Sequence, residues 1–289
     1  MFTFTSQDGV ALHVHTWLPE GETRGIVQIA HGMGEHAARY APFAEHLTGL
    51  GFAVYAGDHR GHGLSMHAGA GHFGENGWNL LVEDIAALTR IARDRHPGVP
   101  VVLLGHSMGS FAAQQYLLDH AALVDGVALS GTTAVDGLLA GLAEAARQAA
   151  EAGIEGGVFD AFNAAFAPNR TDADWLSRDE KQVDAYLADP LCGFAADDRG
   201  MADMGAAAGR LAVPEGIPAD LPVYVLVGDH DPLNARLALS DLLVARYREA
   251  GLTDLTYRSY EGARHELLNE TNRDEVVADL TAWIERVAG

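Results

Sequence analysis

The chain alternates short apolar runs with longer segments in which apolar positions recur every three or four residues. The short runs stop at Gly, Asp or Ser, as strands buried on both faces do, and the longer segments have the spacing of amphipathic helices. The predicted strands are GIVQIAHG, GFAVYAGD, VVLLGHS, GVALSG, PVYVLVGD and LTYRSYEG, and the predicted helices span residues 37–50, 79–95, 107–120, 234–250 and 271–287. This alternation predicts βαβ units in a mostly parallel sheet, with ligands at the carboxyl ends of its strands.

Two regions depart from this rhythm. In VALHVHTWLP, near the N-terminus, apolar and polar residues alternate, which predicts a half-exposed antiparallel strand in an edge hairpin. Between residues 132 and 214 there is no good strand candidate, only Ala- and Gly-rich helical material. We therefore predict an α/β core made of residues 1–131 and 215–289, with helices on both faces of the sheet. Residues 132–214 form a helical cap inserted over it.

Aromatic residues in the predicted cap favour packed helices over the alternative of a flexible linker. The aromatic side chains that need burial there are Phe159, Phe162, Phe166 and Trp175. The three phenylalanines recur at helical spacing and so share one helix face. That face either packs inside the protein, lines a tunnel for an acyl chain or touches lipid, and the pattern leaves these interpretations open.

Composition narrows the possible partners. The 289 residues carry a formal net charge of −21, which makes nucleic acid an unfavourable partner and allows only local, apolar contact with an anionic membrane. The single cysteine, Cys192, cannot form an internal disulfide. The first residues have neither the basic start nor the apolar stretch of a signal peptide, and no run of about 18 apolar residues occurs. We expect a soluble, cytoplasmic protein.

The strongest chemical signal is a serine at the join between a predicted strand and a predicted helix. The sequence GHSMG places Ser107 between Gly105 and Gly109 and fits the G-x-S-x-G nucleophile turn, which needs this strand-to-helix context. Such a turn strains the serine backbone and brings strand and helix so close that the flanking positions have no room for side chains. The alternative is an ordinary turn between a strand and a helix with small residues. We expect Ser107 to be a nucleophile.

A serine nucleophile needs a base and an acid that orients the base. PVYVLVGDHDPLN supplies two acids after a strand, Asp229 and Asp231, and YEGARHELLNE supplies His265 after the last strand. The order Ser, Asp, His is that of the α/β hydrolases. Asp229 lies so close to the strand end that it is better placed to hold the loop. We therefore predict Ser107, Asp231 and His265 as the catalytic residues, with the histidine losing its function as a base on acidification.

An oxyanion hole requires two backbone amides. The amide of Met108 follows the serine at a helix N-terminus, and the turn HGMGEH offers the amide of Met33. His31, in the same turn, could be another base, but bracing of the loop through its ring nitrogens is the preferred interpretation.

Further histidines raise the question of a metal. DHRGHGLSMHAGAGH contains His59, His62, His67 and His72, but they lack the regular spacing of a helical metal site. We expect neither a metal nor a cofactor.

The motifs together resemble one branch of a known superfamily. HGMGEHAARY, GDHRGHGLS, GHSMG, GDHDPL and GARHELLNE, in this order, are similar to the monoacylglycerol lipase and lysophospholipase branch of the α/β-hydrolase superfamily, and RDEKQVDAYLADPL extends the similarity into the cap. The resemblance implies an α/β-hydrolase fold, the catalytic and oxyanion residues predicted above, a structural role for the DHRGHGLS loop and a helical cap over an acyl-chain pocket.

The same resemblance implies a site for the alcohol part of the substrate. In the mammalian monoacylglycerol lipase, the Glu and Arg of this HGxGEHxxRY segment help to bind glycerol, and Glu35 and Arg39 occupy their positions here. An ion pair within the loop is the alternative. The chain departs from that enzyme at Leu268, where the enzyme has a second histidine.

The expected activity is therefore hydrolysis of carboxylic esters of single-chain lipids, monoacylglycerols first, through an acyl-enzyme on Ser107. Lysophospholipase, general carboxylesterase, thioesterase, aminopeptidase and perhydrolase activities use the same residues and stay open as alternatives. A ligand receptor that has kept the pocket is the non-enzymatic alternative. The expected partner is a small lipid ester, with transient contact between the cap and a membrane or micelle.

Overall fold

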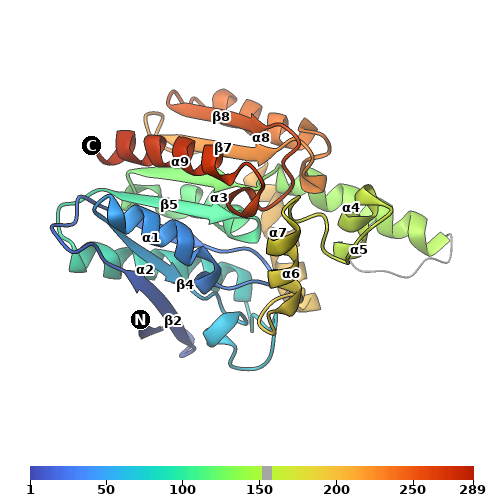
Figure 1. Cartoon of the computed structure of the whole chain (residues 1–289), viewed down its shortest axis with the longest axis horizontal. Coiled ribbons are helices and arrows are strands. Elements are labelled where there is room, and N and C mark those ends of the chain that lie inside the picture. Colours follow the sequence, from blue (N-terminus) through green and yellow to red (C-terminus); the bar gives the residue numbers. More distant parts are fainter. Residues whose placement is uncertain (152–157) are drawn as a thin grey trace.

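The computed structural model describes residues 1–151 and 158–289, which contain one eight-stranded sheet (Figure 1). The strand order across the sheet is β1-β2-β4-β3-β5-β6-β7-β8. The strands are β1 (Phe2–Thr5), β2 (Ala11–Trp17), β3 (Gly25–Ala30), β4 (Phe52–Gly57), β5 (Val101–His106), β6 (Gly126–Ser130), β7 (Val223–Gly228) and β8 (Leu255–Tyr260). Every pair from β4 to β8 is parallel, which confirms the predicted fold class.

The N-terminal hairpin forms one edge of the sheet. β2 pairs antiparallel with β1 on one side and with β4 on the other, so β1 is the outermost strand. The edge hairpin predicted from the alternating pattern is confirmed. The sheet therefore ends at β1 on this side and at β8 on the other.

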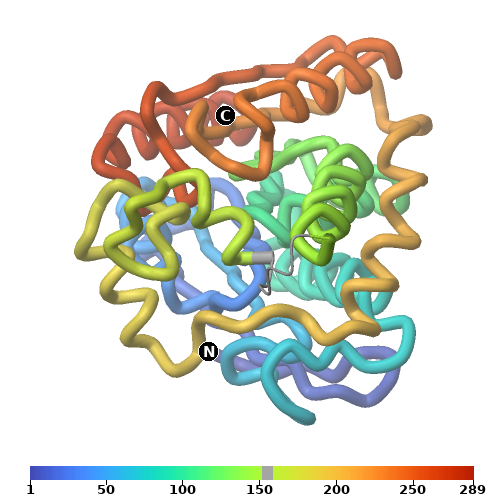
Figure 2. Tube along the Cα trace, turned by 90° about the vertical axis from the view of Figure 1, so that its right-hand side faces the viewer, coloured from blue at the N-terminus to red at the C-terminus, as the bar shows by residue number. Residues whose placement is uncertain are grey.

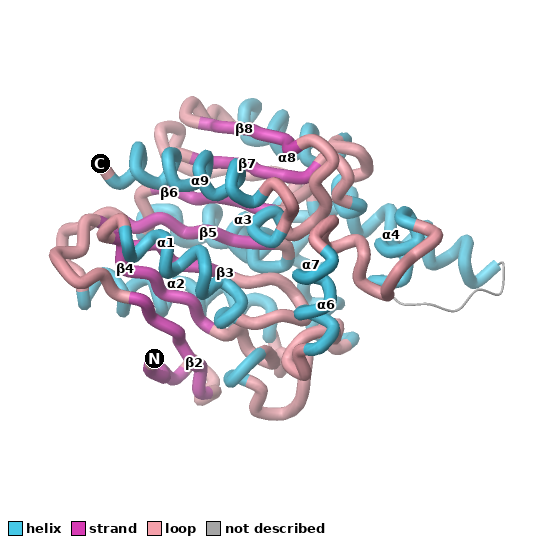
Figure 3. Tube along the Cα trace, in the orientation of Figure 1, coloured by secondary structure: helices cyan, strands magenta, loops and turns pink. Residues whose placement is uncertain are grey.

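Helices cover both faces of the sheet (Figure 3). The helices on one face are α1 (Ala41–Gly49) and α9 (Arg273–Ala288), and those on the other are α2 (Gly77–Arg95), α3 (Met108–His120) and α8 (Ala238–Glu249). Successive side chains of a strand point to opposite faces. In β5, Val101 and Leu103 accordingly pack with α2 and α3, whereas Val102 and Leu104 pack with α1 and α9. Because both faces are covered, the central strands are mostly apolar, and Gln28 of β3 is a buried polar exception that is hydrogen-bonded to α2.

Three of the five predicted helices, α2, α3 and α9, begin within two residues of their predicted start. The helix predicted from residue 37 begins as a 3₁₀ turn, Ala37–Tyr40, which leads directly into α1. The helix predicted from residue 234 is wrong at its start, because α8 begins only at Ala238. Ala235, Arg236 and Leu237 have positive φ angles, which a right-handed helix does not allow. Asn234 holds this turn by accepting a hydrogen bond from the Leu237 amide and donating one to the Gly228 carbonyl.

Helices lie between β6 and β7, beyond the carboxyl ends of the parallel strands (Figure 1). They are α4 (Val135–Glu151), α5 (Val158–Asn163), α6 (Glu180–Ala188) and α7 (Asp198–Leu211). Asp179 and Asp197 cap α6 and α7 by accepting hydrogen bonds from backbone amides of the first turn. Figure 2 looks onto this end of the molecule and shows α4 on one side of it and the segment around residues 165–180 on the other. The part of the predicted insertion at 152–157 is outside the described residues.

Candidate active site

Ser107 lies at a strained corner between β5 and α3. Its φ of 51° and ψ of −123° are outside the regions that non-glycine residues prefer, at a cost of about 1–3 kcal/mol. A Cβ at Gly105 would lie 2.5 Å from the Gly109 oxygen, and one at Gly109 would lie 2.1 Å from the Ala30 oxygen. Glycine at both positions is therefore what lets α3 start directly against β3 and β5. The corner places the serine at the carboxyl end of β5, at the edge of the sheet where ligands are expected.

A cavity of about 640 Å³ opens beside this serine. Ser107 and His265 both line it, and most of the remaining lining is apolar. Cap residues form a large part of that lining: Leu138, Leu139, Leu142, Phe159, Phe162, Trp175, Leu176, Met201 and Met204. The cavity is therefore suited to an apolar ligand chain that ends at the serine.

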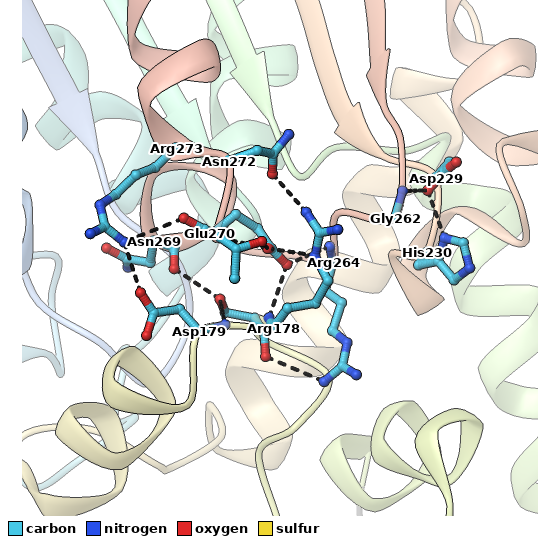
Figure 4. Close-up of polar contacts among 12 residues, drawn as sticks. Arg178, Asp179, Asp229, His230, Gly262, Arg264, Asn269, Glu270, Asn272 and Arg273 are labelled. Atoms are coloured by element: carbon cyan, nitrogen blue, oxygen red, sulfur yellow. Dashed lines mark hydrogen bonds and ion pairs between the residues drawn. The ribbon is translucent and has the colours of Figure 1, made fainter.

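His265 is joined to Asp231 at the edge of the cavity. The two side chains are almost fully buried, and the distance from His265 Nδ1 to Asp231 Oδ2 is 2.8 Å. The other ring nitrogen, Nε2, is buried and has no hydrogen-bond partner among the described residues. Asp229 plays a different part, since it accepts hydrogen bonds from the Gly262 amide and from the His230 ring (Figure 4). The structure thus pairs the histidine with Asp231, not Asp229.

Two opposing effects set the pKa of His265. Burial lowers it, but the charge of Asp231 and the hydrogen bond to it outweigh burial, so the pKa lies above its ordinary value of 6.5. The imidazole is also enclosed by rings, since the Trp175 centroid is 4.9 Å away and the His106 centroid 4.8 Å. Burial and the nearby His265 lower the pKa of His106 to about 4. His106 is therefore neutral near pH 7 and does not share the positive charge.

Two backbone amides at the cavity have no hydrogen-bond partner in the described chain. The amide of Met108 begins α3 directly after the serine, and that of Met33 lies in the turn after β3. A side chain of a neighbouring loop holds this turn, because His62 Nε2 accepts a hydrogen bond from the Gly34 amide at 3.2 Å. The two free donors are available for a developing negative charge.

His31 braces the same turn. Its ring contacts the Gly32 carbonyl at 2.7 Å, and its other nitrogen accepts a hydrogen bond from the His59 amide at 3.0 Å. Burial and the neighbouring His62 lower the pKa of His31 to about 3, so it is neutral near pH 7. The structural interpretation of His31 is confirmed.

Glu35 and Arg39 form an ion pair behind the serine. Arg39 contacts Glu35 at 2.7 Å and forms two parallel hydrogen bonds with Glu266, at 2.6 and 2.7 Å. Glu35 also accepts hydrogen bonds from the Gly32 amide and the Tyr40 hydroxyl. The structure thus shows the loop ion pair that the sequence left as an alternative. All three charged residues also line a second cavity of about 480 Å³, together with Leu268.

The histidines of the DHRGHGLS loop do not form a metal-type cluster. His59 and His62 pack against His31, with ring centroids 4.2 and 5.3 Å from it. Among the described residues, the group that could hold an ion is His36, Asp189 and Cys192. His36 and Asp189 already share a hydrogen bond of 3.0 Å, and burial raises the pKa of the Cys192 thiol to about 12. Both features disfavour a metal there, and we assign none.

The sequence predicted no role at the site for three residues of this region. Glu266 pairs with Arg39, Trp175 lies on the imidazole, and Glu270 is wholly buried beside the histidine loop. Glu266 and Glu270 are within five residues of His265, which was the available signal. Trp175 is distant in the sequence, and only the fold brings it to the base.

Comparisons with known proteins agree with this geometry. The family model described as serine aminopeptidase, S33, matches residues 21–272. The chain is 33% identical to a monoacylglycerol lipase of Mycolicibacterium smegmatis over 98% of this chain and 95% of that protein. It is 29% identical to a monoglyceride lipase of Mus musculus, covering 96% and 88%. Among solved structures, a thermostable carboxyl esterase from Bacillus coagulans, in complex with glycerol, matches with a TM-score of 0.84 and 27% identity, covering 100% and 98%.

The fold is that of the α/β hydrolases, and the chemistry is that of a serine ester hydrolase. The chain belongs to the serine aminopeptidase S33 family, within its branch of lipases and esterases similar to monoacylglycerol lipase. No described helix combines the length and the apolar character needed to cross a bilayer.

Proposed function

We propose that this protein hydrolyses carboxylic esters of single-chain lipids, monoacylglycerols first, through an acyl-enzyme on Ser107. One observation carries the proposal. Ser107 and His265 line one mostly apolar cavity together with residues of the cap, and the His265 ring is hydrogen-bonded to Asp231 through Nδ1 while Nε2 has no partner among the described residues. The names of the relatives from Mycolicibacterium smegmatis and Mus musculus support the same substrate class.

The proposed reaction uses each group at a stated atom. Ser107 Oγ attacks the ester carbonyl carbon as His265 Nε2 takes the hydroxyl proton, and the charge that develops on the carbonyl oxygen is stabilised by the amides of Met33 and Met108. The C–O bond to the alcohol then breaks, and the alcohol leaves with the proton from Nε2. Water repeats the sequence and releases the fatty acid. Asp231 keeps the proton on Nδ1 and stabilises the imidazolium.

The shape of the cap supports a long acyl chain. A wide groove next to the main cavity is lined by small residues of α4 and the following cap segment: Gly137, Gly141, Ala145, Ala161 and Ala165. Leu138, Leu142 and Phe162 line both the groove and the cavity. In our proposal the acyl chain passes from the serine between these side chains towards the groove, so that the cap of residues 132–214 selects the substrate.

The second cavity supports a small polar alcohol. Its charged lining residues, Glu35, Arg39 and Glu266, already satisfy one another, so they would offer a glycerol hydroxyl only the remaining lone pairs of the carboxylates. Leu268 adds an apolar side chain to this wall. We propose that Glu35 and Arg39 bind the alcohol part, less strongly than they bind each other.

The test compares wild type with Ser107→Ala on a panel of monoacylglycerols, diacylglycerols, lysophospholipids and a nitrophenyl ester. We expect monoacylglycerols to give the highest kcat/KM. Ser107→Ala should lose at least about 10⁴-fold of the activity and should no longer be labelled by a fluorophosphonate. Circular dichroism checks that the variant is folded. Retained activity in Ser107→Ala would exclude the mechanism, and a preference for lysophospholipids would exclude the proposed substrate.

A further inference from the structure

One segment of the cap lies directly against the loop that carries His265. The Glu266 amide donates to the Leu176 carbonyl at 2.8 Å, and the His265 amide donates to the Trp175 carbonyl at 3.4 Å. Ser177 Oγ donates to the Asn269 carbonyl at 2.8 Å. Residues 174–178, here called the anchor segment, therefore bond to the histidine loop, residues 264–273.

The anchor segment also covers the histidine ring. The indole of Trp175 is 5% exposed and is tilted by 35° to the imidazole. Phe162 also packs against the indole, with a centroid distance of 5.1 Å. A ring held in this way restricts the rotation of the imidazole and keeps water from its face. The cap thus contacts the face of the imidazole, whereas Asp231 holds the ring edge at Nδ1.

A single buried carboxylate joins the two segments. Glu270 is 0% exposed and accepts hydrogen bonds from the Arg178 amide at 3.0 Å, the Arg178 Nε at 2.8 Å and the Arg264 amide at 2.9 Å (Figure 4). It also accepts one from the Thr271 amide at 2.8 Å. Arg178 lies three residues after Trp175, and Arg264 directly precedes His265. Glu270 therefore binds the backbone close to both of the rings that are in contact. A buried carboxylate needs such donors, and their loss is costly.

Resting on the proposed function, we propose that Glu270 is a positioning residue for the catalytic base. It holds the anchor segment against the histidine loop and so keeps the Trp175 ring on His265, with Nε2 directed to the cavity. The cap is in this respect part of the catalytic machinery and not only a cover over the substrate. The carboxylate itself lies outside the groups that line the main cavity.

Glu270→Gln tests this inference, because glutamine keeps the shape but removes the charge and one acceptor. We expect kcat for a short nitrophenyl ester to fall about 10- to 100-fold, since small displacements of a catalytic group have effects of that order. KM for this short ester should change less than about threefold, because Glu270 does not line the cavity and a short acyl group contacts little of the lining. The downfield proton resonance of His265 Nδ1–H, present in wild type, should broaden or disappear.

Asp179→Asn is the matched control. Asp179 follows the anchor segment directly, caps α6 and pairs with Arg273 at 2.8 Å, away from Trp175, and asparagine still caps α6. We expect wild-type kcat and an unchanged Nδ1–H resonance. Arg178→Ala provides a second variant in case Glu270→Gln does not fold, since the Arg178 side chain is 32% exposed. It should reproduce the loss in kcat.

A double variant identifies the route of the effect. If Glu270 acts through Trp175, Glu270→Gln combined with Trp175→Ala should be no slower than Trp175→Ala alone. A product of the two single effects, or wild-type kcat with an intact resonance in both Glu270→Gln and Arg178→Ala, would overturn the inference. These outcomes are distinct from failure of the proposed function, which would appear as activity in Ser107→Ala.

Discussion

Two parts of the cap differ in how they contact the active site. In the anchor segment, Trp175, Leu176 and Ser177 are buried and bonded to the histidine loop. In α4, the buried residues are Val135 and Leu138, both in its first turns. The later ion pairs of α4 join Arg147 to Glu144 and Glu151 of the same helix, on the exposed surface.

This difference separates two roles within one cap. The anchor segment has fixed bonds to the loop that carries the base, so changes in it should affect the chemical step. Helix α4 contributes Leu138 and Leu142 to the cavity wall, so changes in it should affect which acyl chain fits. The same chemistry is thereby compatible with different chain-length preferences.

The largest loss of kcat is expected at the catalytic acid in the core, and the effects in the two parts of the cap can be compared with it. We expect Asp231→Asn to lower kcat about 10⁴-fold, because the imidazole loses both the acceptor that fixes its tautomer and the charge that stabilises its protonated form. Asp229→Asn is the control and should lose less than about tenfold, since Asp229 only holds the Gly262 amide and His230. Steady-state hydrolysis of a nitrophenyl ester measures both. Equal losses would refute the assignment of Asp231.

Leu142→Trp tests the role of α4. Leu142 lines both the cavity and the groove, so a larger side chain would reduce the space that the proposed path of the acyl chain uses. Losing the burial of two or three methylenes costs about 2 kcal/mol, so kcat/KM for long-chain monoacylglycerols should fall about 30-fold. Kinetics on a butanoyl ester is the control and should be unchanged. A uniform loss across chain lengths would place α4 with the anchor segment.

The pH profile tests how Asp231, which is part of the core, affects the pKa of His265. His265 must be neutral to accept a proton, so activity falls as the pH decreases through its pKa. Because Asp231 raises that pKa above 6.5, the acid limb of kcat/KM in wild type should lie above 6.5. Removing the charge in Asp231→Asn leaves burial, which lowers the pKa, so the limb of the residual activity should move to lower pH. A limb that stays in place would separate Asp231 from the titration.

The smallest expected effects are on the free energy of unfolding, which should differ between variants in the anchor segment and in α4. Arg178→Ala removes a partner of buried Glu270 and should lower the free energy of unfolding by about 2 kcal/mol. Arg147→Ala removes exposed pairs within α4, and its urea midpoint should equal that of wild type. Urea denaturation followed by circular dichroism measures both. Equal midpoints for the two variants would contradict the structural difference between anchor segment and α4.

Local patterns determined the sheet and the serine corner. The apolar runs of the central strands and the glycines around Ser107 can be read in the sequence itself, although the contacts that require them, such as that of Gly109 with the Ala30 oxygen, form only in the fold. The start of α8 was missed because the left-handed turn at residues 235–237 depends on hydrogen bonds from Asn234. Helical periodicity carries no information on such a turn.

The sequence by itself determined the class of fold, the motif order and the residues with the right chemistry for ester hydrolysis. Only the tertiary structure decided which acid meets His265, that Arg39 pairs with both Glu35 and Glu266, and that Glu270 joins the histidine loop to the segment that carries Trp175. The physical reason is distance along the chain. Periodicity reports how a residue faces its own helix or strand, whereas these contacts join segments up to 227 residues apart, which meet only after the sheet and cap have assembled.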